Sequence, residues 1–310
     1  MNQATPILLD CDPGHDDAIA LLLALASPEL ELLGVTTVAG NQTLEKTAVN
    51  ALRVLEFVGR GDVPVAAGAD RPLARELFVA AYVHGESGLD GPVLPEPQGA
   101  PVGQHAVDFL AERILATERP VTLVPVGPLT NIALLLERRP EAAANVERIV
   151  LMGGAIAEGN VTPAAEFNVY VDPEAAWRVF RSGLLVTMIG LDVTHKALMT
   201  DAHAERLRAA GPCGRLVAEL YDFFTEYHRR TYGTEGAPIH DAVAVAQVLR
   251  PGIVETLHRH VDVDCESQLC RGRTVVDLWH RTGNEPNTDV GVGIDADAFL
   301  ELLCGRLASF

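Results

Sequence analysis

Four aspartates stand within eight residues near the beginning of the chain, at Asp10, Asp12, Asp16 and Asp17. An apolar run precedes them and another follows, which predicts a buried strand ending among them and a helix beginning among them. Asp16 and Asp17 suit a helix N-terminus, although capping alone needs only one acid. Clustered like charges at a buried position need a positive partner. Carboxylate oxygens favour Ca²⁺ or Mg²⁺ over zinc, so the spacing predicts a hard-cation site.

A cation at this position needs further oxygen ligands from elsewhere in the chain. Asp241 is one candidate because it begins an apolar helix in PIHDAVAVAQVL, although the helix dipole alone also favours an acid there. The backbone carbonyl of Val126, at the end of a predicted strand, is another. Such a site fits a Mg²⁺ phosphohydrolase with an Asp-x-Asp motif, or a hydrolase whose metal activates water or orients a hydroxylated substrate. Lys46 and Lys196 are the only lysines, and no P-loop is present, which weighs against phosphate chemistry.

The segments that position these residues alternate between strand-like and helix-like patterns. Near-continuous apolar strands between helices predict an open, mostly parallel central sheet flanked by helices. After about residue 195 the pattern predicts a helical insertion and then a small antiparallel C-terminal part. No Ser/Gly-rich linker is present, so residues 1–310 are predicted to form a single domain. Predicted strands are 6–10, 31–40, 63–68, 121–127, 148–154, 184–190, 259–264, 273–279 and 287–293; predicted helices are 16–26, 43–58, 106–116, one beginning at Pro128, 173–181, 201–209, 214–230, 240–249 and 296–307.

One edge of this sheet is the expected site of function. In open parallel sheets ligands bind outside the carboxyl ends of the strands, so all four clustered aspartates are expected near that edge. Two long loops that contain glycine, 69–101 and 231–239, are expected to act as lids or binding loops.

Composition excludes several classes of protein. Lys+Arg number 24 against 42 Asp+Glu, a formal net charge of -18 without a basic block, which argues against nucleic-acid binding. No apolar run approaches the roughly 18 residues of a spanning helix, and no basic region with a long apolar core opens the chain. Five scattered cysteines indicate free thiols in a reducing compartment. A cytoplasmic protein without membrane partners is therefore expected.

Several motifs give the chain a resemblance to a known family. DCDPGHDDA (10–18), EFNVYVDPEAA (166–176) and HDAVAVA (240–246) resemble the nucleoside hydrolases, close to the inosine-uridine preferring branch. The resemblance implies cleavage of the N-glycosidic bond of ribonucleosides to ribose and free base, with one Ca²⁺ per subunit. It also implies a homodimer or homotetramer. Further motifs follow in the family's order at 34–56, 83–91, 125–133, 149–176 and 190–195.

The resemblance also assigns roles to individual residues. It places calcium on Asp12, Asp17, the carbonyl of Val126 and Asp241. The family often has threonine at position 126, but only the backbone oxygen is a ligand. Asp12 is expected to remove a proton from the calcium-bound water, and His240, beside Asp241, to protonate the leaving base. The expected substrate contacts are Asp16, Asn41, His84, Met152, Asn160, Glu166, Asn168 and His228.

Four positions, three of them among these contacts, carry further expectations. Glu166 and Asn168 are two residues apart, so they share one side of the chain if the segment is extended. His228 stands where relatives often carry tyrosine and is expected near the base. His15 stands where relatives carry an apolar or small residue, and it is expected to be a neutral substitution.

The preferred base is predicted from aromatic residues. Purine-specific relatives sandwich the base between tryptophans, whereas Trp177 and Trp279 here are expected to serve only packing. With His240 present and no tryptophan near His84, a broad or pyrimidine-tolerant enzyme is expected, with uridine and inosine as first substrates. Two alternatives remain open. One is a hydrolase of another ribosyl substrate, such as a ribonucleotide or modified nucleoside; the other is a non-catalytic protein that binds calcium or a nucleoside.

Overall fold

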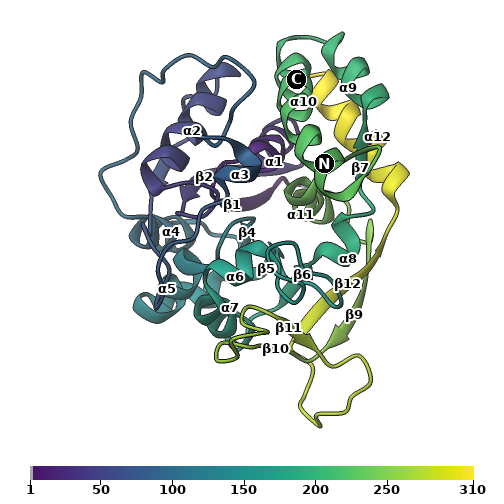
Figure 1. The fold of residues 1–310 in the computed structure, drawn as a ribbon. Coiled ribbons are helices and arrows are strands. Elements are labelled where there is room, and N and C mark those ends of the chain that lie inside the picture. Colours follow the sequence, from purple (N-terminus) through teal and green to yellow (C-terminus); the bar gives the residue numbers. More distant parts are fainter. Residues whose placement is uncertain (1–2) are drawn as a thin grey trace.

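The computed structural model describes residues 3–310 and is built on one large twisted sheet (Figure 1). Its strand order is β3-β2-β1-β4-β5-β6-β12-β9, and every pair is parallel except β12 with β9. The predicted open, mostly parallel sheet flanked by helices is therefore confirmed. The strands are β1 (Thr5–Cys11), β2 (Leu30–Thr37), β3 (Val65–Ala67), β4 (Val121–Pro125), β5 (Val146–Met152), β6 (Val186–Ile189), β9 (Val254–Arg259) and β12 (Thr288–Ile294).

Helices cover both faces of the sheet because successive strand residues point to opposite sides. In β1, Ile7 and Leu9 pack into one apolar core, and Leu8 packs into the other. Figure 1 shows α4, α5 and α7 together below the sheet, and α10 and α12 above it. The first core lies under α1 (His15–Leu25), α2 (Leu44–Phe57), α9 (Asp201–Arg208), α10 (Pro212–Tyr232), α11 (His240–Leu249) and α12 (Ala296–Ala308); the second lies under α4 (Ala106–Ala116), α5 (Thr130–Arg138) and α7 (Pro173–Phe180).

Several local predictions are wrong in detail. The helix expected to begin at Pro128 begins at Thr130, because the Val126 N–H still donates to the carbonyl of Asp10 at 2.8 Å after β4 ends and the chain then bends at Gly127. The late strands do not all belong to the small antiparallel part, because β12 joins the main sheet parallel to β6. Short elements were not anticipated: α3 (Ala81–His84), η1 (Pro140–Asn145), α6 (Phe167–Val171), α8 (Leu191–Thr194), β7 (Leu198–Thr200) and β8 (Gly236–Pro238).

The predicted small antiparallel part is present as a pair of strands, β10 (Val261–Val263) and β11 (Thr274–Val276). Strand β10 packs beside α7. In the part of the chain that the structure describes, no helix is both long and apolar enough to cross a bilayer.

The carboxyl ends of β1, β2, β4 and β5 meet at one edge of the sheet. Asp12 follows β1, Asn41 follows β2 within a few residues, Val126 follows β4, and Met152 ends β5. The N-termini of α1 and α11 approach the same edge, since these two helices pack side by side. Residues far apart in sequence are thereby collected at the edge where parallel sheets bind ligands.

Candidate active site

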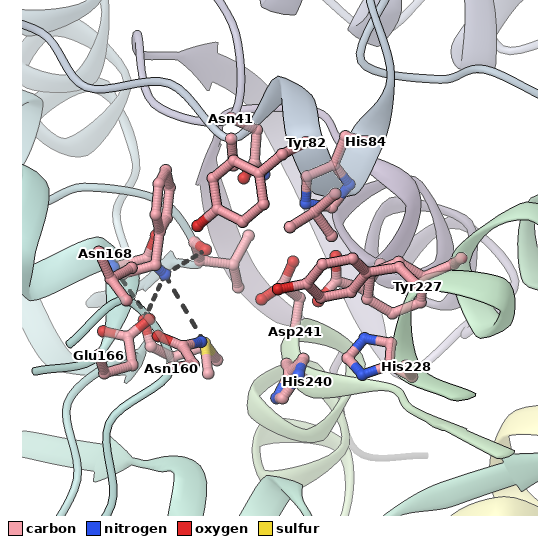
Figure 2. Close-up of a pocket in the computed structure, with 18 of the residues that line it drawn as sticks. Asn41, Tyr82, His84, Asn160, Glu166, Asn168, Tyr227, His228, His240 and Asp241 are labelled. Carbon is pink, nitrogen blue, oxygen red and sulfur yellow. Dashed lines mark hydrogen bonds between the residues drawn. The ribbon is translucent and has the colours of Figure 1, made fainter. Parts of the chain in front are cut away.

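A pocket with about 620 Å³ of empty space, part of it open to solvent, lies over this edge of the sheet (Figure 2). Helix α3 and the end of α10 form its rim, while the start of α11 and the strand-end residues Val126 and Met152 lie below. Both loops expected to carry binding residues contribute to it. The lining residues are Asp16, Asn41, Ala80, Tyr82, Val83, His84, Val126, Met152, Asn160, Val161, Glu166, Phe167, Asn168, His195, Phe224, Tyr227, His228, Tyr232, His240 and Asp241.

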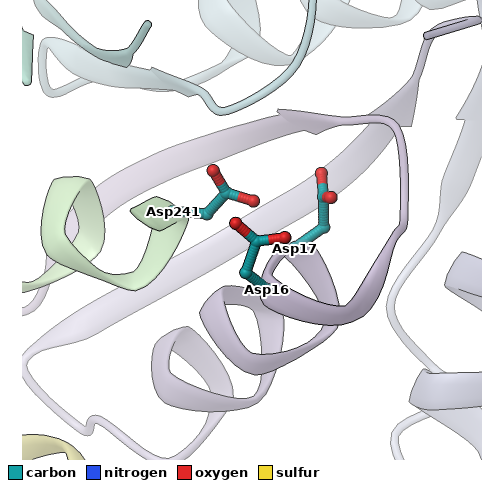
Figure 3. Close-up of side chains that lie close together, drawn as sticks. All are labelled: Asp16, Asp17 and Asp241. Carbon is teal, nitrogen blue, oxygen red and sulfur yellow. The ribbon is translucent and has the colours of Figure 1, made fainter. Parts of the chain in front are cut away.

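Three carboxylates meet at the bottom of the pocket. Figure 3 shows Asp16 and Asp17 at the first turn of α1, with Asp241 facing them from the first turn of α11. One oxygen from each lies within 4.8 Å of the others, and all three side chains are buried. Asp17 is held from behind, because its Oδ1 accepts from the N–H of Asp12 at 3.0 Å and its Oδ2 from that of Gly14 at 2.9 Å. Its orientation is therefore fixed by the turn that follows β1.

Asp12 lies directly beside this group but does not line the open pocket. Its Oδ2 accepts from the N–H of Asn41 at 2.6 Å, and its buried Oδ1 has no hydrogen-bond partner in residues 3–310. The neighbouring backbone approaches very closely. A Cβ at Gly40 would lie 2.1 Å from Oδ2, and one at Gly127 would lie 2.4 Å from Oδ1. Both positions need glycine for Asp12 to fit.

Without a bound cation, the electrostatics of this cluster are unfavourable. Burial, together with the neighbouring carboxylates, raises the pKa of Asp12, Asp16 and Asp241 well above the usual range. Burial also raises the pKa of Asp17, against backbone hydrogen bonds that lower it. Over residues 3–310 no lysine or arginine lines the pocket, so no protein cation compensates these acids.

The donor set fits a hard divalent cation. Carboxylate and carbonyl oxygens are the ligands that Ca²⁺ prefers. The structure brings Asp16, Asp17 and Asp241 together and leaves the Asp12 Oδ1 without a partner. The carbonyl of Val126 also reaches the pocket, where it accepts from the Asn168 side chain at 2.9 Å.

Asp10, the first of the four clustered aspartates, stands near the carboxyl end of β1 but does not line the pocket. It is still inside β1, and its Oδ1 accepts from the Thr36 hydroxyl at 2.5 Å and from the Asn131 amide at 2.8 Å. Burial raises its pKa to about 7 despite these two hydrogen bonds. The carboxylate therefore ties β1 to β2 and α5.

The opposite wall of the pocket carries amides and one carboxylate. The Asn168 Nδ2 donates to the carbonyls of Val126 and Met152, at 2.9 and 3.1 Å (Figure 2). Asn160 Oδ1 is buried without a partner in the described chain, and Glu166 is buried beside it. This set can donate to and accept from hydroxyl groups.

Residues 166–168 are not extended, so the condition under which Glu166 and Asn168 would share one side of a strand does not hold. Glu166 caps the N-terminus of α6, where its side chain accepts from the N–H groups of Asn168 and Val169. These first-turn N–H groups have no carbonyl partner within the helix, which favours the cap over an extended segment. Both side chains nevertheless line the pocket.

The buried Glu166 carboxyl is expected to make stability depend on pH. Burial raises its pKa to about 7, although three backbone hydrogen bonds from Gly154, Asn168 and Val169 lower it. A raised folded-state pKa contributes stability that is complete below the unfolded value of 4.5 and is lost as pH rises towards 7. Glu166→Gln removes this titration. As pH rises from 4.5 to 7, the free energy of unfolding of the wild type should therefore decrease relative to that of the variant, by at most about 3 kcal/mol.

Chemical denaturation from pH 4 to 8 in chelating buffer measures this difference. Glu118→Gln, at an exposed position, is the matched control. A difference between wild type and Glu166→Gln that does not change with pH would contradict the expectation.

Histidines occupy the remaining side of the pocket. Burial lowers the pKa of His84 and His240 well below the usual value, and that of His228 to about 4. The Nδ1 of His240 lies 2.7 Å from the Thr194 hydroxyl, which leaves Nε2 for a ligand. His228 Nε2 is buried without a partner among the described residues.

Sequence reasoning missed the aromatic cover of the pocket. Tyr82 and Tyr227 have ring centroids 6.0 Å apart, and Tyr227 lies 6.3 Å from Tyr232 (Figure 2 shows the first two). The search for tryptophan overlooked these tyrosines, although they stand in or beside the two loops singled out for length. Trp177 and Trp279 lie outside the pocket, as expected. Phe224 and His195 were also missed.

His15, expected from the sequence to be a neutral substitution, lies inside the fold beside the pocket residue His84. Its side chain is fully buried and hydrogen-bonds to both His84 and the backbone of the 85–91 loop. No pattern in the sequence pairs these two histidines, because 69 residues separate them.

Comparison with known proteins agrees with this geometry. Residues 7–301 match the family described as inosine-uridine preferring nucleoside hydrolase. A relative from Salmonella agona, named pyrimidine-specific ribonucleoside hydrolase RihA, is 56% identical over 306 residues, which span 98% of each chain. The protein of the same name from Escherichia coli O81 is 55% identical over the same length and coverage.

Solved structures of relatives share the whole fold. The purine-preferring ribonucleoside hydrolase from Gardnerella vaginalis matches with a TM-score of 0.93 at 35% identity, covering 98% of each chain. The plant nucleoside hydrolase PpNRh1 matches with a TM-score of 0.92 at 34% identity, covering 99% of each chain. The chain therefore belongs to the inosine-uridine preferring nucleoside hydrolase family.

Proposed function

We propose that this nucleoside hydrolase cleaves pyrimidine ribonucleosides, uridine foremost and inosine less well, with a calcium ion bound by the carboxylates under the pocket. The observation that carries the proposal is the buried group of Asp12, Asp16, Asp17 and Asp241, which no lysine or arginine of the described pocket compensates. The names of the relatives at 55–56% identity support a pyrimidine substrate. In the expected ligand set, Asp12, Asp17, Asp241 and the carbonyl of Val126 hold the ion.

Bound calcium supplies a positive charge that acidifies water and binds vicinal hydroxyls. Asp12 then acts as the general base that takes a proton from the attacking water. Its Oδ2 is occupied by the Asn41 N–H, whereas Oδ1 has no protein partner within residues 3–310. The aspartate is held rigidly because Gly40 and Gly127 pack against both of its oxygens. A fixed base close to its water needs little reorganisation in the reaction.

The ribose is expected to bind against the polar wall. Asp16, Asn41, Asn160, Glu166 and Asn168 present carboxylate and amide groups to the pocket, in numbers that suit several hydroxyls. Met152 at the end of β5 lies below them and offers an apolar contact. Hydrogen bonds that fix the sugar can support distortion of the ribosyl carbon towards an oxocarbenium-like transition state.

The base is expected to lie on the histidine and tyrosine side. If the Thr194 hydroxyl donates to Nδ1 of His240, the neutral ring carries its proton on Nε2, which can donate to the departing base. His84 and His228 line the same side and supply further polar contacts. The cover by Tyr82 and Tyr227 limits water around the base.

Two other functions remain as alternatives to this proposal. A ribonucleotide substrate needs cationic side chains that bind its phosphate. No lysine or arginine lines the pocket in residues 3–310, so a different ribosyl substrate would be uncharged. A non-catalytic calcium or nucleoside binder would have the acids without a base and a proton donor, whereas Asp12 and His240 are both in place.

Release of reducing sugar from uridine, cytidine, inosine, adenosine and guanosine tests the proposal. We expect kcat/KM for uridine to exceed that for each purine nucleoside by about tenfold or more, a difference of roughly 1.4 kcal/mol in transition-state binding. Preference for a purine would contradict the base assignment. Binding of uridine without release of sugar would support the binding protein instead.

A further inference from the structure

Residues 155–165 form the loop that brings Asn160 to the pocket, and they are called the Asn160 loop below. The Oδ1 of Asn160 is buried without a partner in the described chain, so it is free to accept a hydrogen bond from a ligand. The loop closes on itself, because the N–H groups of Asn160 and Val161 donate to the carbonyl of Ala165 at 3.2 and 3.3 Å. Its place in the molecule therefore depends on how its two ends are held.

The first end of the loop is held by a threonine from the distant strand β11. The hydroxyl of Thr274 accepts from the N–H of Ala155 at 2.9 Å and donates to the carbonyl of the same residue at 2.5 Å. Thr274 is buried, and a Cβ at Gly154 would lie 2.8 Å from its Cγ2. One hydroxyl thus satisfies both backbone polar groups of Ala155, which an apolar side chain cannot do.

The next backbone groups of this turn are held by α8. The carboxylate of Asp192 accepts from the N–H groups of Ile156 and Ala157 at 2.6 and 3.2 Å. No other hydrogen bond to the backbone of Ala155 is found in residues 3–310. Loss of the Thr274 hydroxyl would therefore leave two backbone groups buried without partners, a cost that favours movement of the loop.

The segment just before β11 also supports the second end of the loop. Gly272 has a φ of +81°, which favours glycine, and a Cβ there would lie 2.7 Å from the Cα of Tyr170 and 3.3 Å from the Cβ of Ala165. The guanidinium of Arg271 lies 4.7 Å from the centroid of the Tyr170 ring. Residues that are two apart in sequence, Gly272 and Thr274, therefore contact the two ends of the Asn160 loop.

The pair of strands that carries Thr274 is itself fixed in place. The N–H of Asp264 donates to the carbonyl of Arg273 at 3.0 Å, which closes the segment between β10 and β11. The side chain of Asn287, just before β12, accepts from the N–H of Val261 at 2.8 Å and donates to its carbonyl at 3.0 Å. Thr274 therefore reaches the loop from a support that is joined to the main sheet.

We propose that Thr274 is a positioning residue that holds the Asn160 loop in place, so that Oδ1 of Asn160 accepts a hydrogen bond from a hydroxyl group of the bound ribonucleoside. Figure 2 shows Asn160 on the same wall of the pocket as Glu166 and Asn168. Thr274 does not line the pocket, so it acts only through the loop. The proposal rests on the proposed function for its ligand, whereas the way in which the loop is held is a property of the protein alone.

Two variants of Thr274 form a matched pair. Thr274→Val keeps the shape and the branching of the side chain but removes the hydroxyl, whereas Thr274→Ser keeps the hydroxyl. Ser27→Ala is the control for loss of a buried hydroxyl elsewhere, because the Ser27 hydroxyl donates to the carbonyl of Leu23 at 2.7 Å near the end of α1 that lies away from the pocket.

Hydrogen exchange in the ligand-free proteins measures how firmly the loop is held. We expect the amides of residues 155–161 to exchange about tenfold faster in Thr274→Val than in wild type, because two hydrogen bonds that oppose local opening are lost. Exchange of this segment should stay unchanged in Thr274→Ser and in Ser27→Ala. Equal exchange in wild type and Thr274→Val would overturn the proposal. Exchange raised by the same factor throughout the main sheet would also overturn it, since Thr274 would then stabilise only the fold.

A double-mutant cycle with Asn160 tests the effect on catalysis. We expect kcat/KM for uridine to fall about tenfold in Thr274→Val, the loss of about one hydrogen bond to the substrate, and to stay within about threefold of wild type in Thr274→Ser. In the Asn160→Ala background the valine substitution should change kcat/KM by less than about twofold, because the group that Thr274 positions is gone. Equal fold losses in the two backgrounds would show that Thr274 does not act through Asn160 and would overturn the proposal.

The two tests separate this proposal from the proposed function. The cycle can use whichever ribonucleoside the wild type hydrolyses best, so a wrong assignment of the base leaves it intact. A protein that hydrolyses none of the five nucleosides would refute the proposed function, whereas hydrogen exchange of residues 155–161, which needs no substrate, would still decide whether Thr274 holds the loop.

Discussion

Replacing Asp12 by asparagine is expected to lower kcat for uridine by roughly three to four orders of magnitude, the upper range for loss of a general base. The amide cannot take the proton from water. It also introduces an N–H₂ group beside Gly40 and Gly127, where the backbone leaves no room for the side chain to turn away. The measurement is steady-state release of reducing sugar, with binding of uridine followed separately.

Asp10→Asn is the matched control for this substitution. It makes the same chemical change two residues earlier, on a carboxylate that bonds to Thr36 and Asn131 outside the pocket. We expect this variant to lose some stability, because an N–H₂ group replaces the unpartnered Oδ2, while kcat stays near the wild-type value. Similar losses of kcat in the two variants would show that the loss comes from a disturbed fold and not from removal of the general base.

Removal of divalent cations is expected to have the second largest effect. A metal that stabilises charge in the transition state contributes several kcal/mol, so thorough chelation should lower kcat/KM by roughly a thousandfold, and Ca²⁺ should restore it. At pH 7 to 8, Ca²⁺ at a hundred times its dissociation constant should also stabilise the fold by about 2.7 kcal/mol. Both follow from buried acids that no protein cation compensates in the described pocket.

Calcium titrations followed by thermal unfolding distinguish a specific site from general screening. Asp241→Asn should abolish most of the stabilisation by Ca²⁺, since it removes one of three carboxylates within 4.8 Å. Asp62→Asn, at an exposed position paired with Arg60, should leave the stabilisation unchanged. Full activity in protein shown to be free of divalent cations would refute the calcium assignment.

The sheet and the floor of the site could be predicted from sequence because local patterns determine them. Apolar runs give the strands, and residues just after parallel strands must share one edge, where Asp12 follows β1 and Val126 follows β4. Asp10 shows the limit of this reasoning. Its distance along the chain from Asp12 is small, but Thr36 and Asn131 provide its partners, and only the fold brings those residues to it.

The cover of the pocket could not be predicted because it depends on distant packing. Nothing in the local pattern at Tyr82 indicates that the end of α10 lies opposite, yet Tyr82 and Tyr227 are neighbours. The same holds for His15, whose ring contacts that of His84, 69 residues away along the chain. Glu166 illustrates a different limit, because its side chain caps the short helix α6, which the sequence did not indicate.

The division between a carboxylate floor and an aromatic cover has a consequence for how such enzymes diverge. The floor is set by strand ends and by the starts of α1 and α11, while Tyr82 comes from the 69–101 segment and Tyr227 and Tyr232 from the end of α10. Substitutions of these three tyrosines change the cover without replacing any of the acids. Exchange of only these two segments between relatives is therefore expected to change the base preference while the strand ends and acids of the floor stay the same.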